Sequence, residues 1–198
     1  MSETMARQFS EVELRIKELT IHIPDKKGFW QRLIEGETSE VKLFSVISDG
    51  VPDNTLHTEL GIFPVDSKNR SIKFGPHGYS LYRNKAGQIP RYLDCHITVV
   101  EDDSDIRSMA QLMSKIRRSD DFKKLTKILL EASLNPVVTI GMDVAKEILG
   151  IGLSILEQNG DDLLMQQYFS FNYRIDGYHG KFQLDSPEAK VSLEVITA

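Results

Sequence analysis

The first half of the chain alternates between hydrophobic and polar residues, which is typical of β-strands that bury one face. Between residues 11 and 23 the apolar positions are Val12, Leu14, Ile16, Leu19, Ile21 and Ile23. The step from Ile16 to Leu19 interrupts the period of two. We therefore expect a strand with a β-bulge or a bend near Lys17.

The same alternation predicts further strands up to residue 101. These segments are 41–47, 55–65, 71–74, 79–82 and 91–100. In the last segment the apolar residues occupy every second position. They are Leu93, Cys95, Ile97 and Val99, whereas Tyr92, Asp94, His96 and Thr98 point to the opposite side. This segment is therefore predicted to be a strand with one hydrophobic face and one polar face.

From about residue 103 to residue 159 the hydrophobic residues recur with the period of a helix. Ser104 is predicted to cap a first helix. Its apolar face would consist of Ile106, Met109, Ala110, Met113 and Ile116. Residues 119–121 and 135–136 are predicted to begin a second and a third helix. The third is apolar around most of its circumference, so we expect it to be largely buried.

Strand patterns return after residue 162. One segment places Phe169, Phe171 and Tyr173 on one face, with Tyr168, Ser170 and Asn172 on the other. A final strand is predicted at 191–195. Because the strands lack regular helical crossovers, they are expected to pair mostly antiparallel. The predicted fold is mainly β, an antiparallel β-sandwich of about eight strands with an inserted three-helix block at roughly 103–159. The sandwich would comprise residues 11–101 and 163–197 of one domain spanning 1–198.

Length and charge are consistent with this interpretation and narrow the function. The chain has 198 residues, which suits one domain with a substantial core, and a net charge of −5 without a basic block. That charge argues against nucleic acid as a partner. A single cysteine, Cys95, excludes an intrachain disulfide. We find no secretory signal and no membrane-spanning segment, so we expect a cytoplasmic protein, with secretion by a signal-less route left open.

An acidic run is the most prominent group of charges. Glu101, Asp102, Asp103 and Asp105 lie where a strand ends and a helix begins, and Asp49 and Asp53 follow an earlier strand. Carboxylate oxygens are the ligands that calcium prefers, so these six residues are a candidate metal site. Capping of the following helix is the favoured alternative, because acidic side chains stabilise a helix N-terminus.

These acidic residues also carry a family resemblance. The stretch from Thr98 to Asp105 resembles the third calcium-binding loop of synaptotagmin-type calcium- and phospholipid-binding β-sandwich modules. Ser48, Asp49 and Gly50, followed by Asp53, resemble the first loop of that family. The resemblance implies calcium as a cofactor and a membrane surface as a partner. The order of strands and helices also resembles bacterial β-sandwich proteins with a helical insertion, which implies no function.

Motifs of catalysis are absent from the sequence. There is no Gly-x-Ser-x-Gly elbow, no phosphate-binding glycine loop and no pair of histidines at metal-binding spacing. Cys95 falls on the apolar face of its strand, where a thiol is usually inert. We therefore favour a protein that is not an enzyme.

One aromatic pair is a candidate contact with a partner. Phe29 and Trp30 follow two lysines and could be an exposed anchor. A short helix over residues 27–33 that packs against the sandwich is the favoured alternative. The sequence thus predicts a non-catalytic binding or protein-interaction module, with a protein partner or a second copy of the chain bound. The alternatives are a calcium-dependent phospholipid-binding module and a hydrolase with an unrecognised site.

Overall fold

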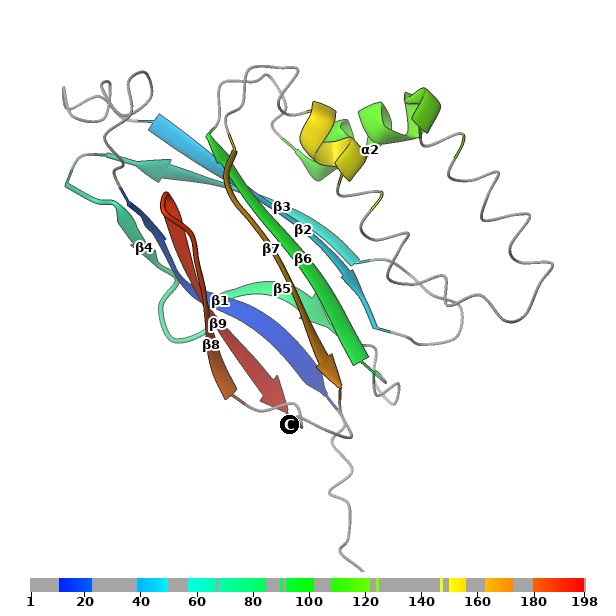
Figure 1. The fold of residues 1–198 in the computed structure, drawn as a ribbon. Helices are drawn as coiled ribbons and strands as arrows, with labels where there is room; N and C mark the ends of the chain where they lie inside the picture. Colours follow the sequence, from blue (N-terminus) through cyan, green and yellow to red (C-terminus); the bar gives the residue numbers. More distant parts are fainter. Residues whose placement is uncertain are drawn as a thin grey trace, which may run out of the picture.

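The computed structural model describes residues 11–22, 39–49, 57–66, 68–84, 90, 92–101, 108–121, 124, 147, 150–155, 163–172 and 180–197. This part of the chain is mainly β, and its strands form two antiparallel sheets (Figure 1). Helical residues lie beside one of the sheets. The predicted fold class, a mainly β antiparallel architecture, is therefore confirmed.

Sheet A has five strands. They are β1 (Val12–Ile21), β4 (Ser71–Lys73), β5 (Tyr79–Arg83), β8 (Gly180–Asp185) and β9 (Ala189–Thr197). Their order is β4-β1-β9-β8, and β5 also pairs with β1. The register between β1 and β9 shifts between Ile16 and Glu18. The irregularity predicted near Lys17 is thus confirmed, because the extra residue returns Leu19 to the buried face.

Sheet B has four strands in the order β3-β2-β6-β7. They are β2 (Ser39–Ser48), β3 (His57–Val65), β6 (Tyr92–Glu101) and β7 (Leu163–Asn172). One face of this sheet packs against sheet A. The hydrophobic residues predicted to share a face of residues 91–100 do lie in this core, and Cys95 is fully buried among them.

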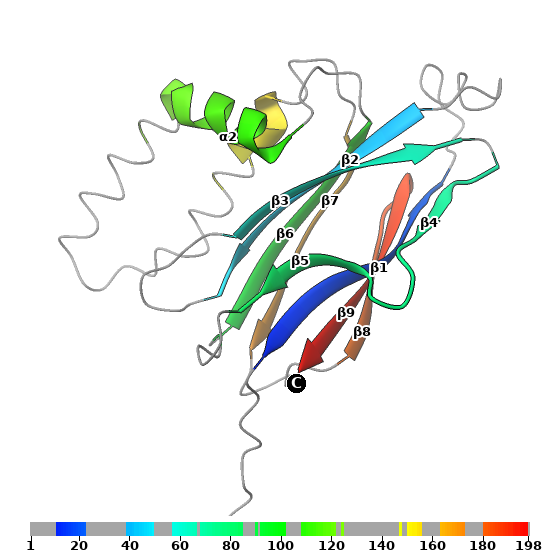
Figure 2. The same ribbon diagram turned by 180° about the vertical axis from the view of Figure 1, so that it is seen from behind.

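The opposite face of sheet B, here called its outer face, carries the helical residues (Figure 2). Helix α2 (Met109–Arg118) begins after Ser108, whose side-chain Oγ accepts a hydrogen bond from Gln111 N at 3.2 Å. Leu112 and Ile116 of α2 are buried. Gly152 lies so close to Phe44 of β2 that an added Cβ would be 2.6 Å from Phe44 Cε1. The helical residues therefore cover part of the outer face.

Three details of the sequence prediction need correction. The described residues contain nine strands rather than eight, because β8 was missed. Within 103–159 the structure gives bounds for α2 alone, with helical backbone also at 120–121, 124, 147 and 150–155, so a three-helix block is not confirmed. Ser108 caps α2, and the expected cap Ser104 lies outside the described residues.

The buried side of α2 also differs from the expected one. Ala110 was predicted on the apolar face but is exposed, and Leu112 is buried together with Ile116. These two residues are four positions apart and so share one face of a helix.

None of the helices in the described ranges has the length and apolar composition that crossing a bilayer requires.

Candidate functional site

Two of the six predicted calcium ligands, Asp49 and Glu101, lie far apart. Asp49 follows the last residue of β2, whereas Glu101 ends β6 opposite Val41, near the first residue of β2. Antiparallel pairing therefore places these two carboxylates at opposite ends of sheet B, about 26 Å apart along the strand. One ion cannot bind both. Asp53, Asp102, Asp103 and Asp105 lie outside the described residues, as do Phe29 and Trp30.

No group of three or more His, Cys, Asp or Glu side chains in the described part of the chain is arranged to hold a metal ion. The sequence does not reveal which strand ends meet, whereas the strand register does.

A polar cluster occupies the outer face of sheet B at β6 and β7. We call it the Tyr168 patch, and it consists of Ser48, Asp94, His96, Thr98, Tyr168 and Ser170. The strand register brings these residues together, because Asp94 pairs with Ser48 on one side and with Ser170 on the other. His96 pairs with Tyr168 in the next row of this face. Three strands thus supply one continuous set of side chains.

Asp94 is the centre of the Tyr168 patch. Its Oδ1 accepts hydrogen bonds from Ser170 Oγ at 2.5 Å and from Tyr168 Oη at 3.2 Å. The residue is only 4% exposed. Burial, and then the negative charge of Asp94, raise the pKa of the Tyr168 phenol. The phenol therefore remains a hydrogen-bond donor at neutral pH.

Aromatic rings form the next part of the patch. The Tyr168 and His96 rings lie with their centroids 4.7 Å apart and their planes inclined at 42°. His96 is buried, but Tyr168 is 43% exposed. Among the described residues, the exposed large hydrophobic side chains are Tyr168 and Leu163, and Leu163 is 41% exposed. The ring of Tyr168 therefore connects a buried polar layer to the surface.

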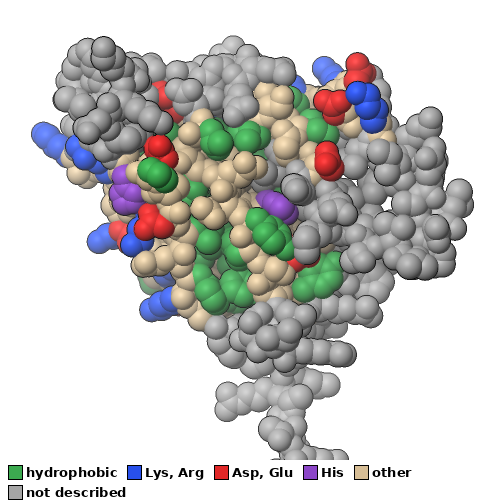
Figure 3. Space-filling model, viewed as in Figure 1, with side chains coloured by type: hydrophobic (Ala, Val, Ile, Leu, Met, Phe, Trp, Pro, Cys, Tyr) green, Lys and Arg blue, Asp and Glu red, His purple; other side chains and the backbone are tan. Residues whose placement is uncertain are grey.

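The deepest members of the patch have unused hydrogen-bonding capacity. Ser48 and Thr98 are fully buried, and within the described ranges neither hydroxyl has a hydrogen-bond partner. A buried polar group without a partner is costly. Figure 3 shows the molecule from the same side as Figure 1; on the described surface most Lys, Arg, Asp and Glu side chains lie toward the margins, and hydrophobic side chains lie nearer the middle.

A second polar cluster lies between the two sheets, and we call it the seam. Asp49 Oδ2 is 3.1 Å from Tyr82 Oη, which donates to it, and 3.4 Å from His57 Nε2. The rings of His57 and Tyr82 meet edge to face at 4.6 Å. These contacts join β5 of sheet A to β2 and β3 of sheet B. A structural role accounts for Asp49, whose carboxylate already has these polar neighbours.

Another contact of the same kind extends the seam. Tyr79 of β5 donates a hydrogen bond to Glu59 of β3 at 2.7 Å. Burial, with the charge and hydrogen bond of Glu59, raises the pKa of this phenol well above its usual range.

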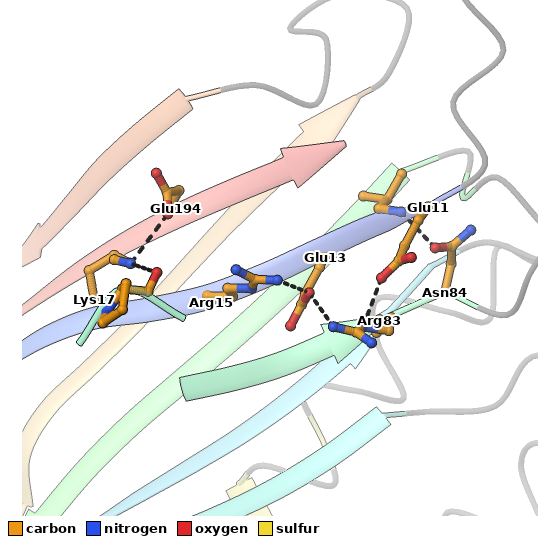
Figure 4. Close-up of polar contacts among 9 residues, drawn as sticks. Glu11, Glu13, Arg15, Lys17, Arg83, Asn84 and Glu194 are labelled. Atoms are coloured by element: carbon orange, nitrogen blue, oxygen red, sulfur yellow. Dashed lines mark hydrogen bonds and ion pairs between the residues drawn. The ribbon is translucent and has the colours of Figure 1, made fainter. Parts of the chain in front are cut away.

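The outer face of sheet A carries paired charges (Figure 4). Glu13 accepts hydrogen bonds from Arg15 Nη2 at 2.5 Å and from Arg83 Nη2 at 2.7 Å. Burial would raise the pKa of Glu13, but the hydrogen bonds from Arg15, Arg83 and Ser80 outweigh it and lower the pKa to about 2. Lys17 pairs with Glu194 at 3.6 Å and donates to Pro76 O at 2.7 Å. This network explains why the strands carry charge without requiring a ligand.

No family model matches the chain, and no curated protein matches it. The candidate site therefore rests on geometry alone. The alternation predicted that Asp94 and His96 face away from the core, and it placed Tyr168 and Ser170 on one face. It did not show that these two segments pair, because they lie more than 70 positions apart in the sequence.

Proposed function

We propose that this protein is a non-catalytic binding module that engages a protein partner through the Tyr168 patch. One observation carries the proposal: an exposed aromatic ring stands next to buried polar side chains, two of which have hydroxyls without a partner in the described residues. Tyrosine is enriched at the centres of protein interfaces, because one end of it is apolar and the other forms hydrogen bonds.

The other polar clusters support this choice by contrast. In the seam, the phenols of Tyr79 and Tyr82 already donate to carboxylates. On the outer face of sheet A, Glu13 is held by two arginines. Such satisfied groups stabilise the fold and have little to gain from a ligand. The Tyr168 patch differs, because the hydroxyls of Ser48 and Thr98 have no hydrogen-bond partner in the described residues and the Tyr168 ring is exposed.

Quantitative capture by matched variants tests the proposal. The immobilised full-length chain is exposed to an extract of its source cells and compared with Tyr168→Ala/Ser170→Ala and with Lys181→Ala/Gln183→Ala. The second pair replaces exposed residues of β8 in sheet A. We expect the patch variant to retain about tenfold less of a specifically bound protein. Loss of an aromatic residue at the centre of an interface typically weakens binding to this extent. Equal retention by both variants would contradict the proposal.

One observation favours a second candidate function, hydrolysis. Asp94, His96 and Ser170 share a face, and Ser170 Oγ donates directly to the Asp94 carboxylate. A serine nucleophile activated by a base needs such a contact. An activated ester such as p-nitrophenyl acetate distinguishes the two functions. If the protein is a binding module, we expect the wild-type chain to hydrolyse the ester no faster than His96→Ala does. A hydrolysis rate that both Ser170→Ala and His96→Ala abolish would favour an enzyme.

The calcium-dependent membrane-binding alternative gains no support from the register, because Asp49 and Glu101 lie at opposite ends of sheet B. Its test is sedimentation with vesicles that contain phosphatidylserine, with calcium or with a chelator. If the protein is a non-catalytic binding module, we expect the same fraction of it to sediment with the vesicles in both conditions.

A further inference from the structure

Resting on the proposed function, we infer that the Tyr168 patch binds the guanidinium group of an arginine side chain on the partner protein. Asp94 carries a carboxylate that is almost completely buried, and none of the ion pairs between described residues involves it. Buried charges are normally paired, because the loss of hydration is otherwise uncompensated.

Glu13 provides an internal comparison for this argument. It is a carboxylate of similar burial on sheet A, and two arginines of the same chain hold it. Asp94 instead has two neutral donors, Ser170 and Tyr168. The chain as a whole has a net charge of −5, which favours the approach of a basic partner. Charge complementarity therefore points to a cation supplied by the partner.

The hydrogen bonds favour arginine over lysine. Both donors of Asp94 bind Oδ1, so Oδ2 remains as the acceptor to which no described residue donates. Ser170 Oγ donates to Asp94 and keeps its acceptor lone pairs. Two acceptor oxygens, Asp94 Oδ2 and Ser170 Oγ, thus lie within one small area. A guanidinium offers five N–H donors in a planar fork and suits this arrangement better than a compact ammonium.

The rings supply the remaining contact. Tyr168 is exposed and lies against His96, so an incoming planar cation can stack on the face of the phenol ring. Arginine forms such cation–π contacts more often than lysine does. A guanidinium group can pair with a carboxylate and stack on an aromatic ring at the same time, and the Tyr168 patch offers both side by side.

Titration with small probes tests this inference. The full-length chain, labelled with 15N, is titrated with N-acetyl-arginine methylamide, and chemical shifts around residues 94 and 168 are followed. The matched probes are the citrulline analogue, which has nearly the same shape without the charge, and the lysine analogue. We expect saturable shifts with arginine, at least tenfold weaker binding of citrulline and several-fold weaker binding of lysine. Asp94→Asn should weaken binding of the arginine probe at least tenfold, and Asp185→Asn on β8 should leave it unchanged.

A second variant tests the inference if Asp94→Asn is unstable. If Asp94→Asn fails to fold, as thermal unfolding would show, Tyr168→Ala changes an exposed residue and should weaken arginine binding by a similar factor. Equal shifts with arginine and citrulline, or with arginine and lysine, would overturn the assignment of guanidinium. No saturable binding would overturn it as well. The proposed function would survive those results if capture still depends on Tyr168 and Ser170, so the two failures are distinguishable.

Discussion

Glu13 lies in an environment unlike that of an ordinary surface carboxylate. Its side chain is 4% exposed although it lies on the outer face of sheet A, beneath Arg15 and Arg83. The sequence shows an alternating charge pattern in β1 but does not reveal that Arg83, 70 positions away, completes the pair. Long-range pairing decides which charges are structural.

The lowered pKa of Glu13 predicts a pH dependence of stability. The pKa in the folded protein is about 2, below the ordinary 4.5. The stabilisation is therefore complete above the ordinary value and is lost as the pH falls from 4.5 towards 2. Glu13→Gln should lower the free energy of unfolding by about 1–3 kcal/mol at neutral pH and flatten its decline below pH 4.5. Urea unfolding at several pH values measures both effects, with Glu11→Gln as the exposed control. Parallel pH profiles of Glu13→Gln and the wild type would contradict this assignment.

Cys95 illustrates what alternation alone can predict at this scale. The pattern placed it on the hydrophobic face, and it is fully buried there. Burial, with the charge of Asp94, raises the pKa of its thiol well above its usual range. We expect Cys95 to react with a disulfide reagent about a hundredfold more slowly in the native protein than in urea, because the thiolate forms only when the strand opens. Equal rates would show that the thiol is accessible.

Among the elements, β8 was missed and the irregularity of β1 was predicted. β8 has six residues and only two apolar ones, Phe182 and Leu184, so its alternation is too short to stand out beside the turn before it. The irregularity was predictable because one extra residue shifts every later apolar position of β1. Whether a short edge strand forms depends on its pairing with the neighbouring strand. A local sequence pattern carries no information about that pairing.

The contact between the helical residues and sheet B depends on a missing side chain. An added Cβ at Gly152 would meet Phe44 Cε1 at 2.6 Å, whereas one at Gly150 would meet nothing within 4 Å. Gly152→Ala should therefore destabilise the protein by about 1–3 kcal/mol. Gly150→Ala should be neutral or stabilising by up to about 1 kcal/mol, since both residues are helical. Thermal unfolding of the two variants compares them, and equal melting temperatures would contradict the packing.

At the scale of the molecule, the two sheets are joined by apolar packing and by the polar seam. The hydroxyl of Tyr82 on sheet A donates to Asp49 on sheet B. Removing it in Tyr82→Phe should cost about 1–2 kcal/mol of unfolding free energy, because the acceptor is a buried carboxylate. Tyr92→Phe is the control, since its hydroxyl has no hydrogen bond with the described residues. A loss no larger than that of the control would show that the seam contributes little.

The mainly β antiparallel architecture could be predicted from alternation, but the candidate site could be predicted only in part. The face to which Asp94 and His96 belong follows from the period of two, and so does that of Tyr168 and Ser170. Their meeting depends on the pairing of β6 with β7, and the separation of Asp49 from Glu101 depends on the pairing of β2 with β6. Both are properties of topology, which local sequence does not specify.

Site-specific photo-crosslinking tests the central claim, that the Tyr168 patch is the surface that binds a partner. A photoreactive residue replaces Gln166, which is exposed next to Tyr168 on β7, or Gln183, which is exposed on β8 of sheet A. Irradiation in the source cells should give a discrete adduct from position 166 and none from position 183. Adding Tyr168→Ala should remove that adduct. The same adducts from both positions, or an adduct from 166 that persists without Tyr168, would contradict the claim.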